Sequence, residues 1–342
     1  MPADQPVQPF RRNANLRLLS CPCIVLVQAE GAVSPPEKWP AALYISPDAL
    51  KTARKRRVRS QVSDMNLVCC IKQVPDTADV KIDPETNTLI RSGVESITNP
   101  YDLVAVQAAV DLKERYGGTV TAISMGPPQA EQALREALSL GADRAVLLSD
   151  RAFAGADTLA TSYTLSRAID KLRQEGPIDL VICGKQAIDG DTAQVGPGIA
   201  TRLGCTQFTY VVEIRQVDQT DGRVTVRRRA EGGSEVISGC LPAVLTVELE
   251  LAKVKRASLP RLINAQRVPI TVWNAESLQA EPERLGLKGS PTWVRRIFSP
   301  PLKKGGPRFD AREDAQQAVE ACVAALLDDT TFAEQLLKHW ER

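Results

Sequence analysis

Strand-like and helix-like segments alternate along the middle of this chain, and this alternation constrains the fold more than any other feature. Short apolar runs, typical of strands buried on both faces, are separated by segments in which apolar residues recur at helical spacing. The expected strands are 67–71, 119–125, 145–148 and 180–183, and the expected helices are 100–116, 129–140, 158–175 and 195–203. This order predicts an α/β fold with a Rossmann-like, doubly wound and mostly parallel sheet. Ligands of such sheets bind beyond the carboxyl ends of the strands, where the strand order reverses.

The sequence that follows predicts a different kind of structure. Residues 209–217 and 223–229 flank a turn-like segment, which predicts an antiparallel hairpin. Residues 243–248 predict a last core strand. After Pro260 the sequence is rich in proline and is expected to be extended, up to a final helix from about 314 to 340.

Composition divides the chain into three regions, 1–64, 65–260 and 261–342. The first contains eight of the 23 prolines and ten Lys or Arg against five Asp or Glu, a local net charge of +5. Three interpretations stay open for it. The first two are a disordered basic leader and a translation start assigned upstream of the true one, because Met65 begins a well-formed strand. The third, a basic arm for nucleic acid or a targeting peptide, is the least favoured. We expect 65–260 to form a nucleotide-binding domain and 261–342 to form a C-terminal arm that ends in a helix.

The overall composition excludes several classes of protein. The 342-residue chain has 43% hydrophobic and 25% charged residues and a formal net charge of +2, so we expect a globular cytoplasmic protein without affinity for nucleic acid. No run of about 18 apolar residues predicts a transmembrane segment. None of the eight cysteines forms a Cys-x-x-Cys pair, which favours reduced core thiols over metal ligands. The single histidine, His339, excludes histidine-based triads and His-rich metal sites.

A glycine-bearing turn after the strand 180–183 is the strongest candidate for a ligand site. Residues 184–198 read Gly-Lys-Gln-Ala-Ile-Asp-Gly-Asp-Thr-Ala-Gln-Val-Gly-Pro-Gly and lead into the helix 195–203. A strand, such a turn and a helix start together present free backbone N–H groups to an anion. The segment matches neither the Walker loop nor Gly-x-Gly-x-x-Gly. It therefore predicts a less common cradle for the phosphate of a nucleotide.

Several ordered motifs point to one family. The most specific is 226–246, where a basic residue, an acidic-Gly-Gly-x-Glu turn and a Pro-x-Val-Leu-Thr strand follow each other. Further motifs are Val-Pro-Asp-Thr at 74–77, Asn-Pro-Tyr-Asp at 99–102, Met-Gly-Pro-Pro at 125–128, Leu-Gly-Ala-Asp-Arg at 140–144 and Gly-Lys-Gln-Ala-Ile-Asp at 184–189. With these motifs at this spacing, residues 65–300 resemble the β subunit of electron transfer flavoproteins.

The resemblance implies an electron carrier made of two different subunits. The α subunit brings one FAD, and the β subunit holds either a structural AMP or, in the electron-bifurcating branch, a second FAD. AMP-holding members tend to read acidic-acidic-Cys-Asn-Gln-Thr-Gly after Gln-Ala-Ile-Asp. Here residues 190–197 read Gly-Asp-Thr-Ala-Gln-Val-Gly-Pro, which resembles the bifurcating branch, and residues 149–161 point the same way. FAD is favoured, and AMP stays open as the alternative.

The two branches differ in their partners. The bifurcating branch oxidises NADH at the β-subunit flavin and sends one electron to ferredoxin or flavodoxin and the other to the α flavin. The alternative is a non-bifurcating carrier that takes electrons from acyl-CoA dehydrogenases to a quinone reductase. In both branches the flavin supplies the redox chemistry, so no catalytic side chain is expected.

The resemblance also assigns the nucleotide to particular residues. Asn99 belongs to a segment that the family places against the adenosine, although an N-cap before Pro100 would explain it as well. Thr192 and Gln194 are expected to donate side-chain hydrogen bonds to phosphate oxygens. The candidate cofactor-binding residues are Cys70, Asn99, Asp102, Met125, Ala187, Asp189, Gly190, Asp191, Thr192, Ala193, Gln194 and Val195.

Other members of this set have competing explanations. Asp189 and Asp191 would repel a phosphate, so we expect them to cap backbone N–H groups or to accept from ribose hydroxyls. Cys70 and Met125 end strands where the family contacts the nucleotide, but packing in the core explains both equally well. Lys72 would supply positive charge to the phosphates or be a plain surface residue, and it is left outside the set.

Two segments suggest protein partners. Residues 251–261 match the loop with which the family docks a dehydrogenase, with the apolar Leu259 in a basic setting; a solvated charged loop is the alternative. The C-terminal helix carries an apolar stripe that is expected to cover the α subunit or the body of this chain. Its members are Ala318, Val319, Cys322, Val323, Leu326 and Leu327. An adenylyl-transfer enzyme is disfavoured, because residues 72–77 read Lys-Gln-Val-Pro-Asp-Thr instead of Ser-Gly-Gly-x-Asp-Ser.

Overall fold

A computed structural model of the chain describes residues 26–30, 64–76, 81–82, 89–90, 96–294, 307–312 and 314–328. The expectations for most of the leader 1–64 and for the helix beyond 328 lie outside these residues. The chain forms two compact units, Met1–Arg296 and Ile297–Arg342, and each is described by itself.

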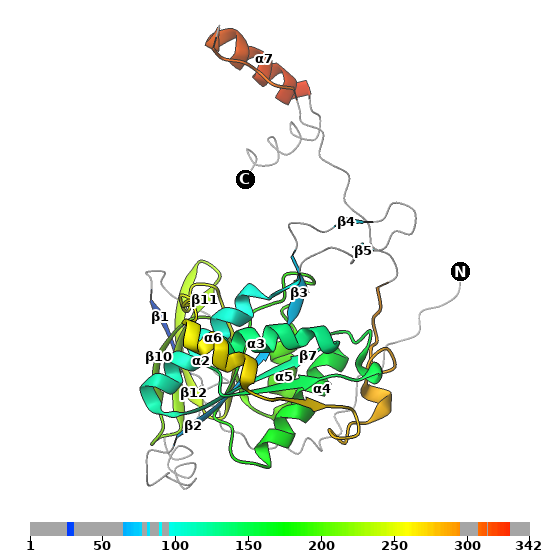
Figure 1. Cartoon of the computed structure of the whole chain (residues 1–342). Coiled ribbons are helices and arrows are strands. Elements are labelled where there is room, and N and C mark those ends of the chain that lie inside the picture. The colour runs from blue at the N-terminus through cyan, green and yellow to red at the C-terminus, as the bar shows by residue number, and fades with distance from the viewer. Residues whose placement is uncertain are drawn as a thin grey trace, which may run out of the picture. The chain divides into compact units, whose positions relative to one another are not determined.

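The first unit is built on one large sheet. Within the described residues it has ten strands, in the order β1-β12-β11-β10-β13-β9-β2-β7-β8-β14 (Figure 1). All neighbours from β10 to β14 in this order run parallel, which confirms the predicted parallel sheet. These strands are β2 (Met65–Ile71), β7 (Gly118–Met125), β8 (Arg144–Leu148), β9 (Leu180–Gly184), β10 (Thr206–Asp218), β13 (Ala243–Val247) and β14 (Ile270–Trp273).

Helices cover both faces of this sheet, as a doubly wound fold requires (Figure 1). Leu67 and Cys69 of β2 face a core built with the helices α2 (Pro100–Tyr116), α3 (Glu131–Leu140) and α6 (Leu259–Arg267). Val68 and Cys70 face a second core built with α4 (Thr158–Arg173) and α5 (Val195–Leu203). Successive side chains of a strand point to opposite faces, so burial of both faces explains the unbroken apolar run of β2.

The strand order reverses beside β2. The chain passes from β2 through α2 to β7 and through α3 to β8, and α4 then carries it back to β9 on the other side of β2. The carboxyl ends of β2 and β9 therefore lie next to each other at the switch point, where the sequence analysis expects a ligand. The turn 184–194 begins at this end of β9.

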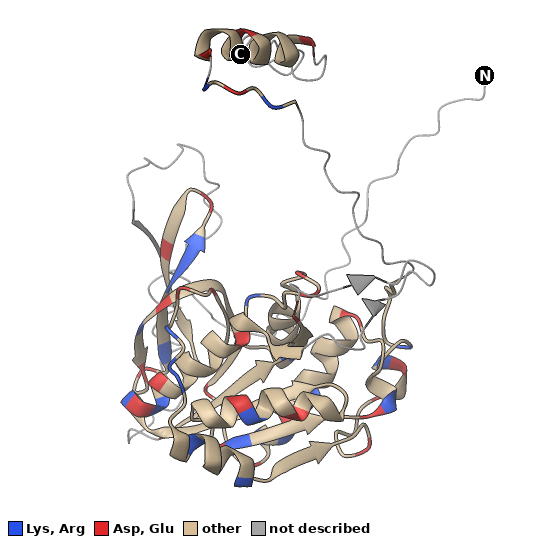
Figure 2. Cartoon of the chain, turned by 45° about the horizontal axis from the view of Figure 1, so that its top comes forward, with Lys and Arg blue, Asp and Glu red and all other residues tan. Residues whose placement is uncertain are grey.

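The other end of the sheet is antiparallel. The predicted hairpin is formed by β10 and β11 (Arg223–Ala230), and a strand not foreseen from the sequence, β12 (Gly233–Cys240), extends it. Beyond it lies β1 (Leu26–Glu30), the one strand that the structure describes in the leader. Arginines of β11 are paired with acidic residues, Arg227 with Glu213 at 2.8 Å and Arg228 with Glu235 at 3.0 Å. Charges of both signs lie side by side on these strands (Figure 2).

Several short elements connect the large ones. β3 (Gln73–Pro75) pairs with β6 (Ser96–Thr98), and β4 (Lys81–Ile82) pairs with β5 (Leu89–Ile90). Single 3₁₀ turns occupy Pro128–Ala130, Arg151–Phe153 and Pro282–Arg284.

The expectation of an extended chain after Pro260 was wrong for its first part. Residues Leu259–Arg267 form α6, and residues Ile270–Trp273 add β14 to the sheet edge. Pro260 lies in the first turn of α6, where its missing N–H group would have no intrahelical partner and its fixed φ suits a helix. A proline there marks the start of a helix rather than its absence.

The second unit contains α7 (Ala315–Asp328), which confirms a helix over the described part of 314–340. Its apolar side chains Val319, Val323 and Leu327 are exposed. Within the described part of the chain, no helix combines the length and the apolar character that a membrane crossing requires.

Candidate functional site

Asp102, in the first turn of α2, joins the two strands at the switch point. Its Oδ2 accepts the backbone N–H of Lys72 at 2.8 Å, and its Oδ1 accepts the backbone N–H of Gly184 at 3.0 Å. Lys72 follows β2, and Gly184 is the last residue of β9. One buried carboxylate therefore fixes the relative position of both strand ends.

Asn99 holds the segments that follow β2 and β9. Its backbone N–H donates to the carbonyl of Lys72 at 2.9 Å, and its side-chain amide donates to the carbonyl of Gln186 at 2.9 Å. Its side-chain oxygen accepts the backbone N–H of Ile188 at 3.3 Å. The capping interpretation of this side chain was wrong, since Asn99 occupies the N-cap position without a side-chain capping bond. A carboxamide both donates and accepts, so it can span the turn after β9, whereas a cap would use only its oxygen.

Burial changes the pKa of Asp102. Burial raises the pKa of this carboxyl group from 3.8 to about 7, although hydrogen bonds from Asn99, Lys72 and Gly184 act in the opposite direction. Removal from water is the larger effect because a buried carboxylate loses its hydration. The switch point is therefore held by a group that titrates near neutral pH.

The turn after β9 contains unusual backbone conformations. Gly190 and Asp191 donate their N–H groups to the carbonyl of Ala187, at 3.2 and 2.9 Å. Asp191 and Ala193 then adopt φ values of 48° and 53°, in the left-handed region that non-glycine residues rarely occupy. Strained backbone of this kind concentrates at ligand sites.

This conformation leaves a row of backbone donors without acceptors. Within the described part of the chain, five consecutive N–H groups form no hydrogen bond, and they run into the start of α5. An α-helix cannot satisfy its own first N–H groups, and its N-terminal end carries partial positive charge. The five residues are Thr192, Ala193, Gln194, Val195 and Gly196. Their donor set suits phosphate oxygens.

The acidic side chains of the turn have partners close by. Lys72 Nζ lies 2.6 Å from Asp189 Oδ2, and Gln186 Nε2 donates to Asp191 Oδ1 at 2.7 Å. No backbone N–H of a described residue donates to either carboxylate, so the capping alternative was wrong. Acceptance from ribose hydroxyls stays a prediction. Gln194 Oε1 accepts the hydroxyl of Thr158 at 2.8 Å, which orients the Gln194 amide group and ties the turn to α4.

The remaining candidates lie at the strand ends beneath the turn. Cys70 is buried and is the register partner of Cys183 in the pair of β2 and β9, and a side-chain hydrogen bond with Cys70 together with burial raises the pKa of Cys183 well above its ordinary value. The Cys183 thiol therefore stays protonated and unreactive at neutral pH. Met125 ends β7 and is half-buried against the same core.

Sequence reasoning missed Lys185, the first residue after β9. Its Nζ lies 3.3 Å from the buried Glu248 and 5.4 and 5.7 Å from the ring centroids of Tyr101 and Tyr210. The motif Gly-Lys-Gln-Ala-Ile-Asp contains it, but its partners come from α2, from β10 and from the residue after β13. Within the described residues, no group of three or more His, Cys, Asp or Glu side chains has the arrangement of a metal site.

Comparison with known proteins decides the family. A family model described as "Electron transfer flavoprotein domain" matches residues 86–278, which include Asn99, Asp102 and the turn after β9. The chain belongs to the electron transfer flavoprotein family. Within this family it is a β subunit that takes part in electron transfer, and a β subunit implies an α-subunit partner.

Its relatives include members with different names. The chain is 48% identical to "Protein FixA" of Bradyrhizobium diazoefficiens over 77% of this chain and 91% of that protein. It is 49% identical to "Electron transfer flavoprotein subunit beta" of Clostridium acetobutylicum over 78% of this chain and 99% of the other. It is 51% identical to "Caffeyl-CoA reductase-Etf complex subunit CarD" of Acetobacterium woodii over 71% of this chain and 90% of that protein.

We expect Gly184→Ala to destabilise this flavoprotein subunit. A Cβ at this position would lie 2.3 Å from Asp102 Oδ1 and 2.9 Å from the backbone carbonyl carbon of Tyr101. Overpacking of this kind costs about 1–3 kcal/mol of the free energy of unfolding, measured by urea denaturation. Gly233→Ala is the matched control, because nothing lies within 4 Å of its Cβ. Equal stabilities of the two variants would contradict the close approach.

A second prediction concerns the titration of Asp102. Because its pKa is raised on folding, from 3.8 to about 7, the native protein binds more protons than the unfolded chain between these values. The stability that this group contributes is therefore present at low pH and is lost as the pH rises through about 7. Asp102→Ala removes both acceptors and should cost about 3 kcal/mol at about pH 5, and less at about pH 8. A cost that grows with pH would contradict the raised pKa.

Proposed function

We propose that this β subunit holds FAD at the switch point and takes part in NADH-dependent electron bifurcation together with its α subunit. The observation that supports the cofactor is the row of five free N–H groups from Thr192 to Gly196. One phosphate group uses only some of these donors, whereas the diphosphate of FAD has oxygens for all of them. The ion pair of Asp189 with Lys72 reduces the repulsion toward such an anion, and the Asp191 carboxylate is bound by the Gln186 amide.

The chain's residues would bind and orient this cofactor. Asn99 and Asp102 hold the strand ends on which the adenosine would lie, and Gln194 and Thr192 add side-chain donors beside the backbone amides. When bound, the flavin supplies the electron transfer, and the protein sets its position and surroundings. No nucleophile or acid–base pair of this chain is required.

The subtype rests on two further observations. Residues 190–194 read Gly-Asp-Thr-Ala-Gln instead of the acidic-acidic-Cys-Asn-Gln that the AMP-holding branch favours. The name of one relative, a "Caffeyl-CoA reductase-Etf complex subunit", describes a flavoprotein in a complex with a reductase. The second candidate is the carrier with AMP in this subunit, which would link acyl-CoA dehydrogenases to a quinone reductase.

The proposal of an FAD-holding, bifurcating subunit includes three further parts. These are NADH as electron donor, ferredoxin or flavodoxin as one acceptor, and a location in the cytoplasm.

Flavin content of the purified heterodimer tests the cofactor. We expect about two flavins for each heterodimer, and Thr192→Asp should lower this to about one, because a new carboxylate beside the free amides repels a phosphate. Thr220→Asp, in the exposed turn between β10 and β11, is the control and should leave the content unchanged. One flavin with one released AMP would instead support the AMP-holding carrier.

The docking surface for a dehydrogenase is proposed at the start of α6. Leu259 is 68% exposed, and Leu262 and Ile263 are exposed beside it, an apolar patch at a helix start. Exposed apolar groups of this kind mark protein contacts. The sequence analysis proposed Leu259 as the docking residue, and the structure adds Leu262 and Ile263 from the next helical turn.

Leu259→Asp tests this surface. We expect the rate constant for reduction of the heterodimer by its reduced dehydrogenase to fall about tenfold or more, with flavin content unchanged, because a charge at the centre of an apolar contact is costly. Val272→Asp serves as the control, since Val272 is 60% exposed on the edge strand β14. An equal loss in both variants, or in neither, would remove Leu259 from the docking surface.

A further inference from the structure

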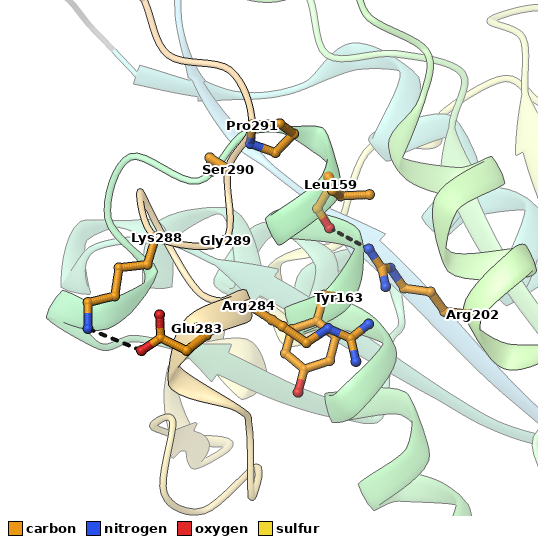
Figure 3. Close-up of a pocket in the computed structure, with 9 residues that line it drawn as sticks. All are labelled: Leu159, Tyr163, Arg202, Glu283, Arg284, Lys288, Gly289, Ser290 and Pro291. Atoms are coloured by element: carbon orange, nitrogen blue, oxygen red, sulfur yellow. Dashed lines mark hydrogen bonds and ion pairs between the residues drawn. The ribbon is translucent and has the colours of Figure 1, made fainter.

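A concave site that uses none of the residues of the turn after β9 lies on the face of the sheet covered by α4 and α5. It is a cavity of about 520 Å³ between α4, the last turn of α5 and the segment 283–291 (Figure 3). Cavities of this size hold small molecules. Three of its nine lining residues are cations, Arg202, Arg284 and Lys288, and one is acidic, Glu283.

The two arginines converge on one aromatic ring. The Arg284 guanidinium lies 4.1 Å from the ring centroid of Tyr163, and that of Arg202 lies 5.6 Å from it (Figure 3). Arg202 is further fixed by hydrogen bonds from its Nε to Ser162 Oγ at 3.2 Å and from its Nη2 to the carbonyl of Leu159 at 3.0 Å. Both guanidinium groups are thus oriented before any ligand arrives.

The positive charge of this cavity is only partly balanced. Arg284 and Lys288 form long ion pairs, 3.4 Å to Glu281 and 3.5 Å to Glu283, and such exposed pairs are weak. Arg202 forms no ion pair with any described residue. Burial and the nearby positive charge of Arg284 lower the pKa of Arg202, the direction expected when two like charges face each other.

The cavity wall is held by the segment that closes it. Ser290 Oγ accepts the N–H of Asp157 at 2.8 Å, and Thr292 Oγ1 donates to Asp157 Oδ2 at 2.8 Å. Asp157 in turn caps α4 through the N–H groups of Leu159 and Ala160. The segment that carries Arg284 and Lys288 is therefore anchored to the helix that carries Tyr163.

We propose that this cavity binds a phosphate-bearing small molecule, with a phosphate group between Arg202 and Arg284 and the remainder of the molecule against Leu159 and Pro291. Guanidinium groups hold phosphate oxygens through paired N–H donors, and binding relieves the repulsion between the two arginines. The site uses none of the residues of the turn after β9, so it is independent of the flavin proposal.

Titration of the flavin-loaded heterodimer with inorganic pyrophosphate tests this site. Calorimetry should show binding at millimolar pyrophosphate or below, and Arg202→Gln and Arg284→Gln should each raise the Kd about tenfold or more. Arg267→Gln, which changes an exposed arginine of α6, is the matched control and should leave the Kd unchanged. Succinate, a dicarboxylate, should bind more weakly than pyrophosphate.

The following results would overturn the proposal. It fails if the wild-type protein gives no binding heat at about 10 mM pyrophosphate, or if the Arg202→Gln variant binds as the wild type does. Loss of binding in Thr192→Asp with retention in Arg202→Gln would assign pyrophosphate to the turn after β9. Tighter binding of succinate would assign the cavity to carboxylates. Should Arg284→Gln not fold, Arg202→Gln decides the question alone.

Discussion

The carboxyl group of Asp102 is the interaction on which the rest of the candidate site depends. It accepts N–H groups from the ends of β2 and β9, the two strands between which the sheet reverses its order. Gly184 must be glycine for this approach, because a Cβ would occupy the position of the carboxylate. Asn99, three residues earlier, holds the chain that follows both strands. The turn that reaches α5 therefore starts from a fixed point. The strained Asp191 within it is held by hydrogen bonds to Ala187 and from Gln186.

The two proposed anion sites are built on different principles. At the switch point the donors are backbone N–H groups at a helix start. Of the acidic side chains nearby, Asp189 is paired with Lys72 and Asp191 accepts a hydrogen bond from Gln186. In the cavity beside α4 the donors are the side chains of Arg202 and Arg284, which approach each other around Tyr163. Backbone donors cannot be lost by side-chain substitution, whereas the arginine pair can be lost by a single change.

Much of this arrangement could be predicted from the sequence, because it depends on local pattern. The periodicity of apolar residues located the helix Pro100–Tyr116 with both its ends, and the strand, turn and helix pattern located the turn after β9. The role of Asn99, the pairing of Lys72 with Asp189 and the meeting of Arg202 with Arg284 could not be predicted. Each joins residues far apart in the sequence, and the fold alone brings them together. Strand β12 was missed because a Gly-Gly pair reads as a turn and carries no information about the strand that begins within it.

The central claim is that the N–H groups from Thr192 to Gly196 hold the phosphates of a nucleotide at the switch point. A crystal structure of the heterodimer with the nucleotide that co-purifies in this subunit tests it most directly. The account predicts phosphate oxygens within hydrogen-bonding distance, about 3 Å, of these backbone nitrogens, with the adenosine beside Asn99. A nucleotide bound elsewhere in the subunit, or these N–H groups bonded to protein carbonyls in the presence of the nucleotide, would contradict it.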